Sequence, residues 1–427
     1  MARTDVHGYQ VHGRECGRKA AMESFLRAAP GRAALAGIPD LGKRLSPVDA
    51  RLKSPAMKPL LSALFAILVS FYSTSAAETF PTLPLGSNAP DFNLPGVDGR
   101  NWSLKDFEDA KILVIVFTCN HCPTAQYYEE RIKRIAADYK GKGVAFATIM
   151  PNDPKAVRLD ELGWTDLGDS FDEMKIRARD RHFNFPYLYD GDTESVAHAY
   201  GPSATPHVFV FDAVRKLRYV GAIDNSERIE HVTKHYLREA LEALLADKEP
   251  PVTQTKVVGC SIKWSGKEAS AQAYLNRLAA EPVSVSDADT NLLRALRKND
   301  SGKFRVVTFW ATWCAPCVAE FSEFVTIHRM YRHRDFELVT VSMNRPDEMP
   351  TVLAFLKKQQ ASNRNLIFAS ADRDALINAF DPDWSGAVPY TVLIDPEGKI
   401  IYRETGSIGS LALKRAIQQA LNERKPW

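Results

Sequence analysis

Two pairs of cysteines, each separated by two residues, are the side chains in this sequence most suited to chemistry. Cys314 and Cys317 frame Ala-Pro, and Cys119 and Cys122 frame Asn-His. The apolar run 305–310 precedes the first pair and residues that favour a helix follow it, so we expect Cys314 at a helix start. Backbone N–H groups and the helix dipole there lower a cysteine pKa from about 8.5 and favour the thiolate. The spacing therefore predicts thiol–disulfide exchange, with Cys314 attacking and Cys317 displacing the partner.

The residues around Cys314 also resemble a known family. Trp313 before the pair and Glu320 three residues after Cys317 are similar to the extracytoplasmic TlpA/ResA-type branch of the thioredoxin superfamily. Val388-Pro389 resembles the cis-proline loop of that superfamily, which lies against the active cysteines and offers its backbone to a substrate strand. The resemblance implies a groove lined by these two residues and by Trp313. Glu320 shares a helix face with Cys317, so we expect it to accept the proton of this resolving thiol.

The first half of the chain repeats the pattern of the second. Residues 111–123 match 304–316, and a predicted hairpin at 89–100 resembles the opening segment of AhpC/TSA-type redoxins, which are peroxiredoxin-like. Thr205-Pro206 corresponds to the later Val-Pro pair and is expected to line a second groove. The predicted fold class is therefore α/β, with two thioredoxin-like α/β/α sandwich domains in tandem. We place them at 84–264 and 283–427, with a linker at 265–282 that is helical in part.

The first cysteine pair is expected to exchange disulfides like the second, but with a different reduction potential. His121 adds positive charge beside the thiolate of Cys119, which favours the reduced form and makes this site the more oxidising one. When Cys119 is aligned with Cys314, Ala125 is the counterpart of Glu320 and Leu113 that of Thr308. This alignment leaves the first site without a carboxylate to handle protons.

Three other uses of these residues remain open. The first alternative is peroxidase activity of the first domain. Peroxiredoxin-like peroxidases resemble one another in the motif Pro-x-x-x-Thr-x-x-Cys, whereas here Thr118 directly precedes Cys119. A soft ion such as Cu(I) could be carried by Cys119, Cys122 and His207, although we predict no metal and no cofactor. Cys260 is unpaired after the leader and is either an inert buried thiol or a resolving partner for the first site.

The beginning of the chain reads as a leader. Residues 57–77 have one lysine, an apolar run and small residues ending at Ala77, which predicts a signal peptide; an uncleaved anchor is the alternative. Residues 1–56 are basic and lack periodicity, so we expect a misassigned start before Met57 or a disordered leader. Residues 1–77 hold 11 Lys and Arg against 5 Asp and Glu, a net charge of +6. The whole chain has a net charge of +3, so the remaining residues carry −3 and the positive charge belongs to the leader. We therefore predict no nucleic-acid partner.

Taken together, the sequence predicts a periplasmic or otherwise extracytoplasmic thiol–disulfide oxidoreductase. Its expected partners are disulfide-containing client proteins and a membrane or periplasmic redox protein that the sequence does not identify. No membrane span is expected once the signal peptide is cleaved. The rival from another class is a non-enzymatic module, either a metal carrier or a protein-binding scaffold.

Overall fold

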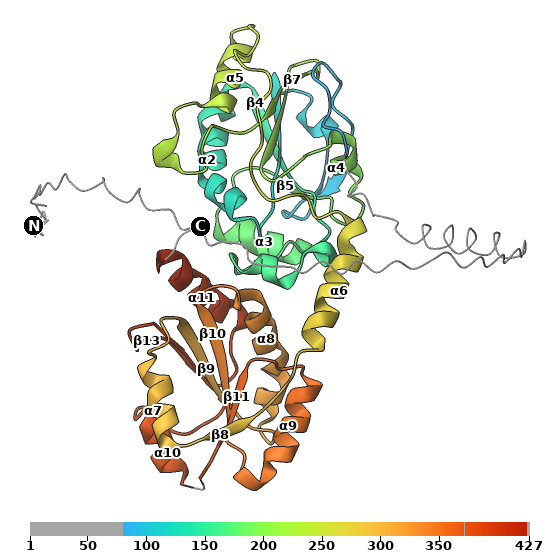
Figure 1. Ribbon diagram of the computed structural model, residues 1–427. Coiled ribbons are helices and arrows are strands. Elements are labelled where there is room, and N and C mark those ends of the chain that lie inside the picture. Colours follow the sequence, from blue (N-terminus) through green and yellow to red (C-terminus); the bar gives the residue numbers. More distant parts are fainter. Residues whose placement is uncertain (1–79, 371, 425–427) are drawn as a thin grey trace, which may run out of the picture. The chain divides into compact units, whose positions relative to one another are not determined.

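The computed structural model describes residues 80–370 and 372–424, which form two α/β domains (Figure 1). The predicted leader at 1–56 and signal peptide at 57–77 lie outside the described residues. In the part of the chain that is described, we find no helix with the length and apolar character needed to cross a membrane.

Each domain alternates strands and helices. The first contains these strands and α-helices: β1 (Asn93–Pro95), β2 (Asn101–Ser103), β3 (Ile112–Phe117), α2 (Pro123–Tyr139), β4 (Val144–Met150), α3 (Phe171–Asp180), β5 (Tyr187–Tyr189), α4 (Ser195–Tyr200), β6 (His207–Phe211), β7 (Leu217–Gly221) and α5 (Tyr236–Leu245). The second contains β8 (Ser286–Ala288), α7 (Thr290–Lys298), β9 (Phe304–Trp310), α8 (Ala315–Tyr331), β10 (Phe336–Ser342), α9 (Met349–Lys358), β11 (Arg364–Phe368), α10 (Arg373–Phe380), β12 (Tyr390–Ile394), β13 (Ile400–Thr405) and α11 (Ser410–Arg424).

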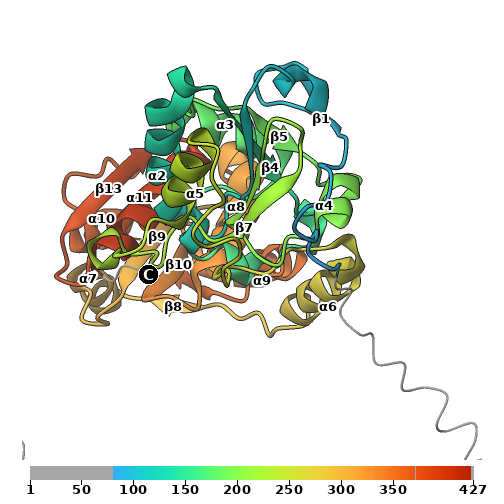
Figure 2. The same ribbon diagram turned by 90° about the horizontal axis from the view of Figure 1, so that it is seen from above.

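The first domain is built on a five-stranded sheet in the order β5-β4-β3-β6-β7. β3 is parallel to β4 and antiparallel to β6, and all six of its residues are buried. Alternate β3 side chains enter two separate cores, because successive side chains of a strand point to opposite faces of a sheet. α2 and α5 cover one face, where the two helices lie side by side (Figure 2), and α4 covers the other. The predicted hairpin is present as the antiparallel pair β1 and β2.

The second domain has a six-stranded sheet in the order β13-β12-β9-β10-β11-β8. Its central strand β9 is also buried along its whole length. α8 and α11 pack on one face of this sheet, and α7 and α10 pack on the other. The predicted α/β class with two sandwich domains is confirmed. The short strand β8, which lies parallel at the edge beside β11, has no counterpart in the first sheet.

Two segments connect or close the domains. The predicted linker at 265–282 contains α6 (Glu268–Ala279), with Ala271 and Leu278 buried, in line with the expectation that it is helical in part. The first domain closes with α5, which follows a single 3-10 turn at Ile229–His231.

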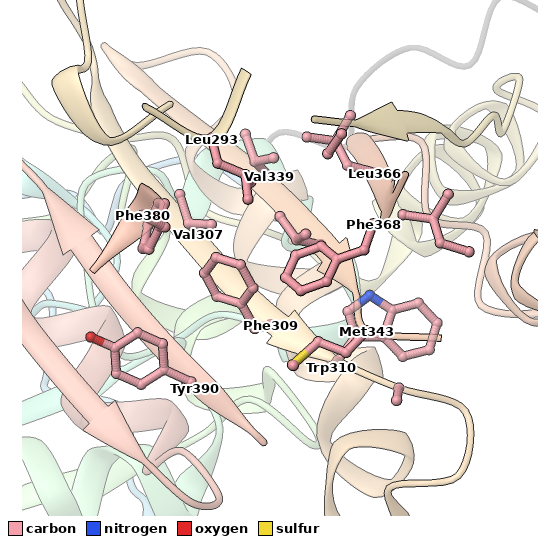
Figure 3. Packing of buried hydrophobic residues seen from close by; sticks show 14 of the residues in the cluster. Leu293, Val307, Phe309, Trp310, Val339, Met343, Leu366, Phe368, Phe380 and Tyr390 are labelled. Carbon is pink, nitrogen blue, oxygen red and sulfur yellow. The ribbon is translucent and has the colours of Figure 1, made fainter. Parts of the chain in front are cut away.

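Phe309 is the centre of an aromatic cluster in the second domain (Figure 3). Its fully buried ring lies 4.5 Å from the ring of Trp384 and 4.7 Å from that of Phe380. We expect Phe309→Ala to lower the free energy of unfolding of this domain by about 3–5 kcal/mol, because it removes buried contacts and leaves a cavity. Urea denaturation followed by near-UV circular dichroism would measure the loss. Ile401→Ala, on the more exposed strand β13, is the control, and an equal loss in both variants would contradict the prediction.

Candidate active site

Cys314 lies where β9 ends and α8 begins. It is the N-cap residue of α8, and its Sγ accepts a hydrogen bond from the backbone N of Cys317 at 3.3 Å. Cys314 and Cys317 are joined by a disulfide, and both are largely buried. The strand-to-helix corner that the sequence predicted is therefore present, and an N–H group at the helix start is aimed at the first sulfur.

The residues predicted to line the groove lie at the same edge of the sheet as this disulfide. β12 runs antiparallel to β9, with Tyr390 paired to Phe309, so the start of one strand adjoins the end of the other. The peptide between Val388 and Pro389, just before β12, is cis. Trp313 is 55% exposed immediately before Cys314. An exposed indole and the backbone of Val388 thus lie at the edge of the sheet that carries the disulfide.

Glu320 lies one turn beyond Cys317 on α8 and is half-buried. Its Oε2 accepts a hydrogen bond from the backbone N of Ile408 at 2.9 Å, which holds the carboxylate under the loop before α11. Burial raises the pKa of Glu320, and the hydrogen bond from Ile408 opposes part of this effect. A carboxyl group with a raised pKa is a better proton acceptor at neutral pH than an exposed one.

Asn344 is a positioning residue that the sequence analysis missed. Its Oδ1 accepts hydrogen bonds from the backbone N of Thr312 at 3.0 Å and from Ser342 Oγ at 2.9 Å. Its Nδ2 donates to Thr312 Oγ1 at 2.7 Å. Asn344 therefore fixes the loop that delivers Cys314, and its place just after an apolar strand is the only sequence signal for it.

The strand registers show which cysteine of the first domain corresponds to Cys314. Phe117 pairs with His207, the residue after Pro206, just as Phe309 pairs with the residue after Pro389. On their other sides Phe117 pairs with Ile149 and Phe309 with Val341. Both registers make Phe117 the counterpart of Phe309. Cys122, five residues later, then takes the place of Cys314 and is likewise the N-cap residue of its helix, α2.

This register corrects the alignment of the two motifs. Cys119 does not occupy the place of Cys314, and Ala125 is the counterpart of Cys317 rather than of Glu320. Tyr128, whose hydroxyl donates to Asp224 Oδ1 at 2.8 Å, stands where Glu320 stands in the second domain. The sequence alignment of the two motifs was wrong because it matched Cys119 to Cys314. The pairing of β3 and β9 with their neighbouring strands shows instead where each strand ends and where the following helix begins.

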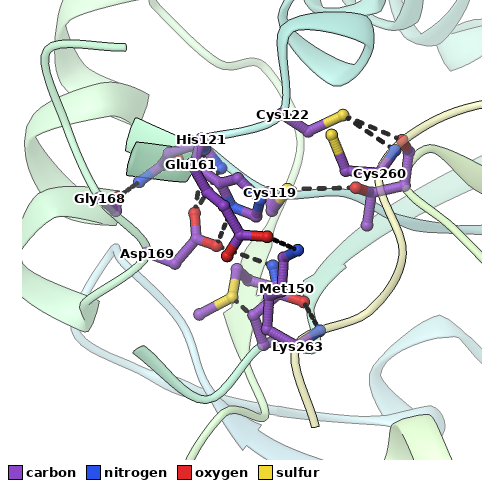
Figure 4. Close-up of polar contacts among 12 residues, drawn as sticks. Cys119, His121, Cys122, Met150, Glu161, Gly168, Asp169, Cys260 and Lys263 are labelled. Carbon is purple, nitrogen blue, oxygen red and sulfur yellow. Dashed lines mark hydrogen bonds and ion pairs between the residues drawn. The ribbon is translucent and has the colours of Figure 1, made fainter. Parts of the chain in front are cut away.

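Cys119 and Cys122 have different surroundings (Figure 4). Cys119 Sγ lies 3.1 Å from Thr205 Oγ1, and burial raises the pKa of this thiol well above its ordinary value. Cys122 Sγ accepts a hydrogen bond from the backbone N of Ala125 at 3.4 Å and lies 3.3 Å from the carbonyl O of Thr205. Burial alone would raise the pKa of Cys122, but hydrogen bonds from Cys119 and Cys260 and the charge of His121 lower it well below the ordinary value. Cys122 is thus the thiol whose ionised form this site favours.

His121 is held by the carboxylate of Asp169, which lies between β4 and α3. Its Nδ1 lies 2.5 Å from Asp169 Oδ2, and its backbone N donates to Asp169 Oδ1 at 3.1 Å. Asn152, the counterpart of Asn344, donates to the same carboxylate at 2.7 Å. Burial alone would lower the pKa of His121, but the charge of Asp169, its hydrogen bond and the charge of Cys122 together raise this pKa. Asp169 therefore favours the protonated form of His121 beside Cys122, and no spacing in the sequence signalled it.

Cys260 also lies at this site. Its backbone N donates to Cys122 Sγ at 3.3 Å, and its carbonyl O accepts from the backbone N of Thr205 at 2.9 Å (Figure 4). The Thr205–Pro206 peptide is cis, so Cys260 pairs with the first domain's own cis-proline loop. Cys260 is partly exposed, in contrast to Cys119 and Cys122.

The metal alternative named His207 together with Cys119 and Cys122. Its Nδ1 accepts a hydrogen bond from the backbone N of Ser203 at 3.1 Å, and burial lowers its pKa to about 4. The atoms of Cys119, His121 and Asp169 do lie within 4.8 Å of one another, but His121 and Asp169 are already hydrogen-bonded to each other.

Comparison with known proteins agrees with this geometry. The sequence model of the AhpC/TSA family matches residues 85–220, and that of the Redoxin family matches residues 276–416. The thiol:disulfide interchange protein HelX of Rhodobacter capsulatus is 30% identical over 158 residues, which are 37% of this chain and 77% of HelX. The thiol-disulfide oxidoreductase ResA of Bacillus subtilis is 30% identical over 120 residues, which are 28% of this chain and 63% of ResA. The match thus spans just under two thirds of that relative.

Among solved structures, an uncharacterized conserved protein from Geobacillus kaustophilus is 38% identical, covering 44% of this chain and 96% of its own, with a TM-score of 0.39. The disulfide at a helix start beside a cis-proline loop, the two matching families and the likeness to HelX lead to one assignment. The chain belongs to the thiol-disulfide oxidoreductase family of thioredoxin-like proteins, with an AhpC/TSA-type domain followed by a redoxin-type domain.

Proposed function

We propose that this protein is an exported thiol-disulfide oxidoreductase that exchanges disulfides with client proteins through Cys314 and Cys317. The observation that carries the proposal is the disulfide at the start of α8, next to an exposed Trp313 and a cis-proline loop at the same sheet edge. Export is supported by the signal-like sequence of residues 57–77.

The exchange has two steps. In the reduced protein, the Cys314 thiolate attacks one sulfur of a client disulfide, and the other client sulfur leaves as a thiolate that takes up a proton. The Cys317 thiol gives its proton to Glu320 and attacks Cys314 Sγ, which releases the second client sulfur. The client disulfide is then reduced and Cys314–Cys317 is oxidised, as it is in this structure. The same steps in reverse oxidise a client dithiol.

The client is a protein segment in extended conformation. The backbone of Val388 lies before β12 and, among the described residues, takes part in no strand ladder or isolated bridge. Its N–H and C=O groups can therefore pair with a client strand, and Trp313 offers the client an apolar contact. The first domain is proposed to act through Cys122, which occupies the corresponding helix start.

Replacing each cysteine of the second pair should separate the two steps. Cys314→Ser should abolish reduction of insulin disulfides by this domain, because the attacking thiolate is absent. Cys317→Ser should instead accumulate a mixed disulfide with the client, because the resolving thiol is absent. Non-reducing gel electrophoresis and insulin turbidity would show both effects, with Ser322→Ala on the same helix as the control. Wild-type turnover by Cys314→Ser would contradict the assignment of this site.

Glu320→Gln should slow the resolving step at neutral pH by at least about tenfold, because the amide cannot accept the Cys317 proton. Only ionised Glu320 accepts a proton, so the wild-type rate should fall as the pH drops through its raised pKa. Glu320→Gln should lack this fall. Glu323→Gln is a matched control, because Glu323 Oε2 likewise accepts a hydrogen bond from the segment at the start of α11, from Ser410 Oγ at 2.9 Å. Stopped-flow rates of mixed-disulfide resolution across pH would test this, and identical profiles for wild type and Glu320→Gln would exclude the role.

Asp169→Asn should raise the pKa of Cys122. Loss of the carboxylate lowers the pKa of His121, so the imidazole is neutral at pH 7 and no longer stabilises the thiolate. The alkylation rate of Cys122 across pH, read by mass spectrometry, would report the change. Asp172→Asn, at an exposed position in the first turn of α3, should leave the profile unchanged. A Cys122 profile in Asp169→Asn equal to that of wild type would show that the His121 charge does not act on this sulfur.

A further inference from the structure

The cis-proline loops of the two domains differ in what lies against them. No isolated bridge involves Val388 among the described residues, whereas Thr205 forms an antiparallel bridge with Cys260. The bridge uses the hydrogen bond from Thr205 N to the Cys260 carbonyl O, at 2.9 Å. The first domain therefore carries a stretch of its own chain in the place where a thioredoxin-like fold pairs with a partner strand.

The fit between this stretch and the loop is close. A Cβ atom on Gly259, whose φ is +155°, would lie 1.9 Å from the carbonyl O of Thr205. Only glycine allows the two backbones to approach in this way. On the C-terminal side, Ile262 and Trp264 are buried in the first domain's core, and Lys263 N donates to Asn152 Oδ1 at 2.9 Å. On the N-terminal side, Val258 is 65% exposed. Further toward the N-terminus, Thr255 N donates to the carbonyl O of Val220 at 3.1 Å. The stretch 258–261 is thus held on both sides and exposes Val258 between its anchors.

The side chain that this stretch delivers is a cysteine, and it meets Cys122. Cys260 N donates to Cys122 Sγ, and the Cys260 side chain lies within hydrogen-bonding range of the same sulfur. Cys122 itself is fully buried under these contacts. The position held by Cys317 in the second domain is Ala125 here, so α2 provides no resolving thiol of its own. Cys119, the other neighbour of Cys122, is buried before the helix against Thr205 Oγ1.

We propose that residues 258–261 act as a built-in substrate strand of the first domain and that Cys260 is the redox partner of Cys122. Between its anchors at Thr255 and Ile262, the strand moves off the Thr205–Pro206 loop to admit an external disulfide, and its return brings Cys260 back to Cys122. This inference goes beyond the function proposed for Cys314 and Cys317 and does not depend on it.

The chemistry is a balanced exchange. The Cys122 thiolate attacks one sulfur of an external disulfide, the bond between the two external sulfurs breaks, and the first external thiolate leaves and takes up a proton. The Cys260 thiol loses its proton to solvent, and its thiolate attacks Cys122 Sγ and displaces the second external thiolate. One external disulfide becomes two thiols, and two protein thiols become the Cys122–Cys260 disulfide.

Peptide mapping distinguishes this disulfide from Cys119–Cys122. The full-length reduced protein is treated with oxidised glutathione, its free thiols are blocked with iodoacetamide, and it is digested with trypsin without reductant. Cys119 and Cys122 share the tryptic peptide 112–131, whereas Cys260 lies in peptide 257–263. We expect the two peptides to be cross-linked in the wild type and in Cys119→Ser, and not in Cys122→Ser. An internal disulfide in peptide 112–131 of the wild type, without the cross-link, would overturn the proposal.

A second measurement tests the strand without touching a cysteine. Gly259→Ala should push the strand off Thr205 and speed alkylation of Cys122 in the reduced protein several-fold. Gly86→Ala is the matched control, because Gly86 also has positive φ, +79°, but a Cβ there meets no atom within 4 Å. Equal Cys122 alkylation rates in both variants and wild type would show that residues 258–261 do not shield the sulfur. Cys314 and Cys317 lie in the separate tryptic peptide 306–329, so failure of their chemistry would be seen independently.

Discussion

The hydrogen bond from a backbone N–H at a helix start to a cysteine sulfur is the interaction on which the rest of this structure depends. In the second domain it joins Cys317 N to Cys314 Sγ, and in the first it joins Ala125 N to Cys122 Sγ. Each sulfur reaches this position because a fully buried central strand ends a few residues earlier and leads directly into a helix. The hydrophobic cores on the two faces of the sheet hold the end of this strand in place. Side-chain packing in each domain therefore also positions its cysteine sulfur.

The two domains use the same helix start and surround it differently. The second places its resolving cysteine one turn along the helix and leaves the cis-proline loop free for another chain. The first has Ala125 at that position, places Cys119 before the helix, and covers the loop with residues 258–261. Under the proposed function, the second site receives a partner's strand, whereas the loop of the first is paired with a strand of its own chain. A shared fold thus supports two arrangements of thiols, because the groups around the helix start come from loops that vary independently of the sheet.

Charge is also placed differently at the two sites. At the first, a buried chain of hydrogen bonds runs from Asn152 through Asp169 to His121, and it favours the protonated imidazole near Cys122. At the second, the half-buried carboxylate of Glu320 lies on the resolving side of the helix. A cation favours the thiolate, whereas a carboxylate of raised pKa favours removal of a thiol proton. The counterpart asparagines Asn152 and Asn344 support different partners, one a carboxylate and the other the loop before Cys314.

The sequence by itself determined the two α/β domains and the strand-to-helix corner at Cys314, which depend on apolar runs and on spacing within short segments. Its resemblance to the thioredoxin superfamily implied the cis-proline loop at 388–389, to which residues 205–206 correspond in the internal repeat. Only the tertiary structure decided that Cys122 rather than Cys119 corresponds to Cys314, because strand register fixes the helix start and cysteine spacing does not. It also brought Asp169 to His121 across 48 residues and Cys260 to Cys122 across 138. Contacts at such separations depend on the path of the chain around a packed core, and no local pattern encodes that path.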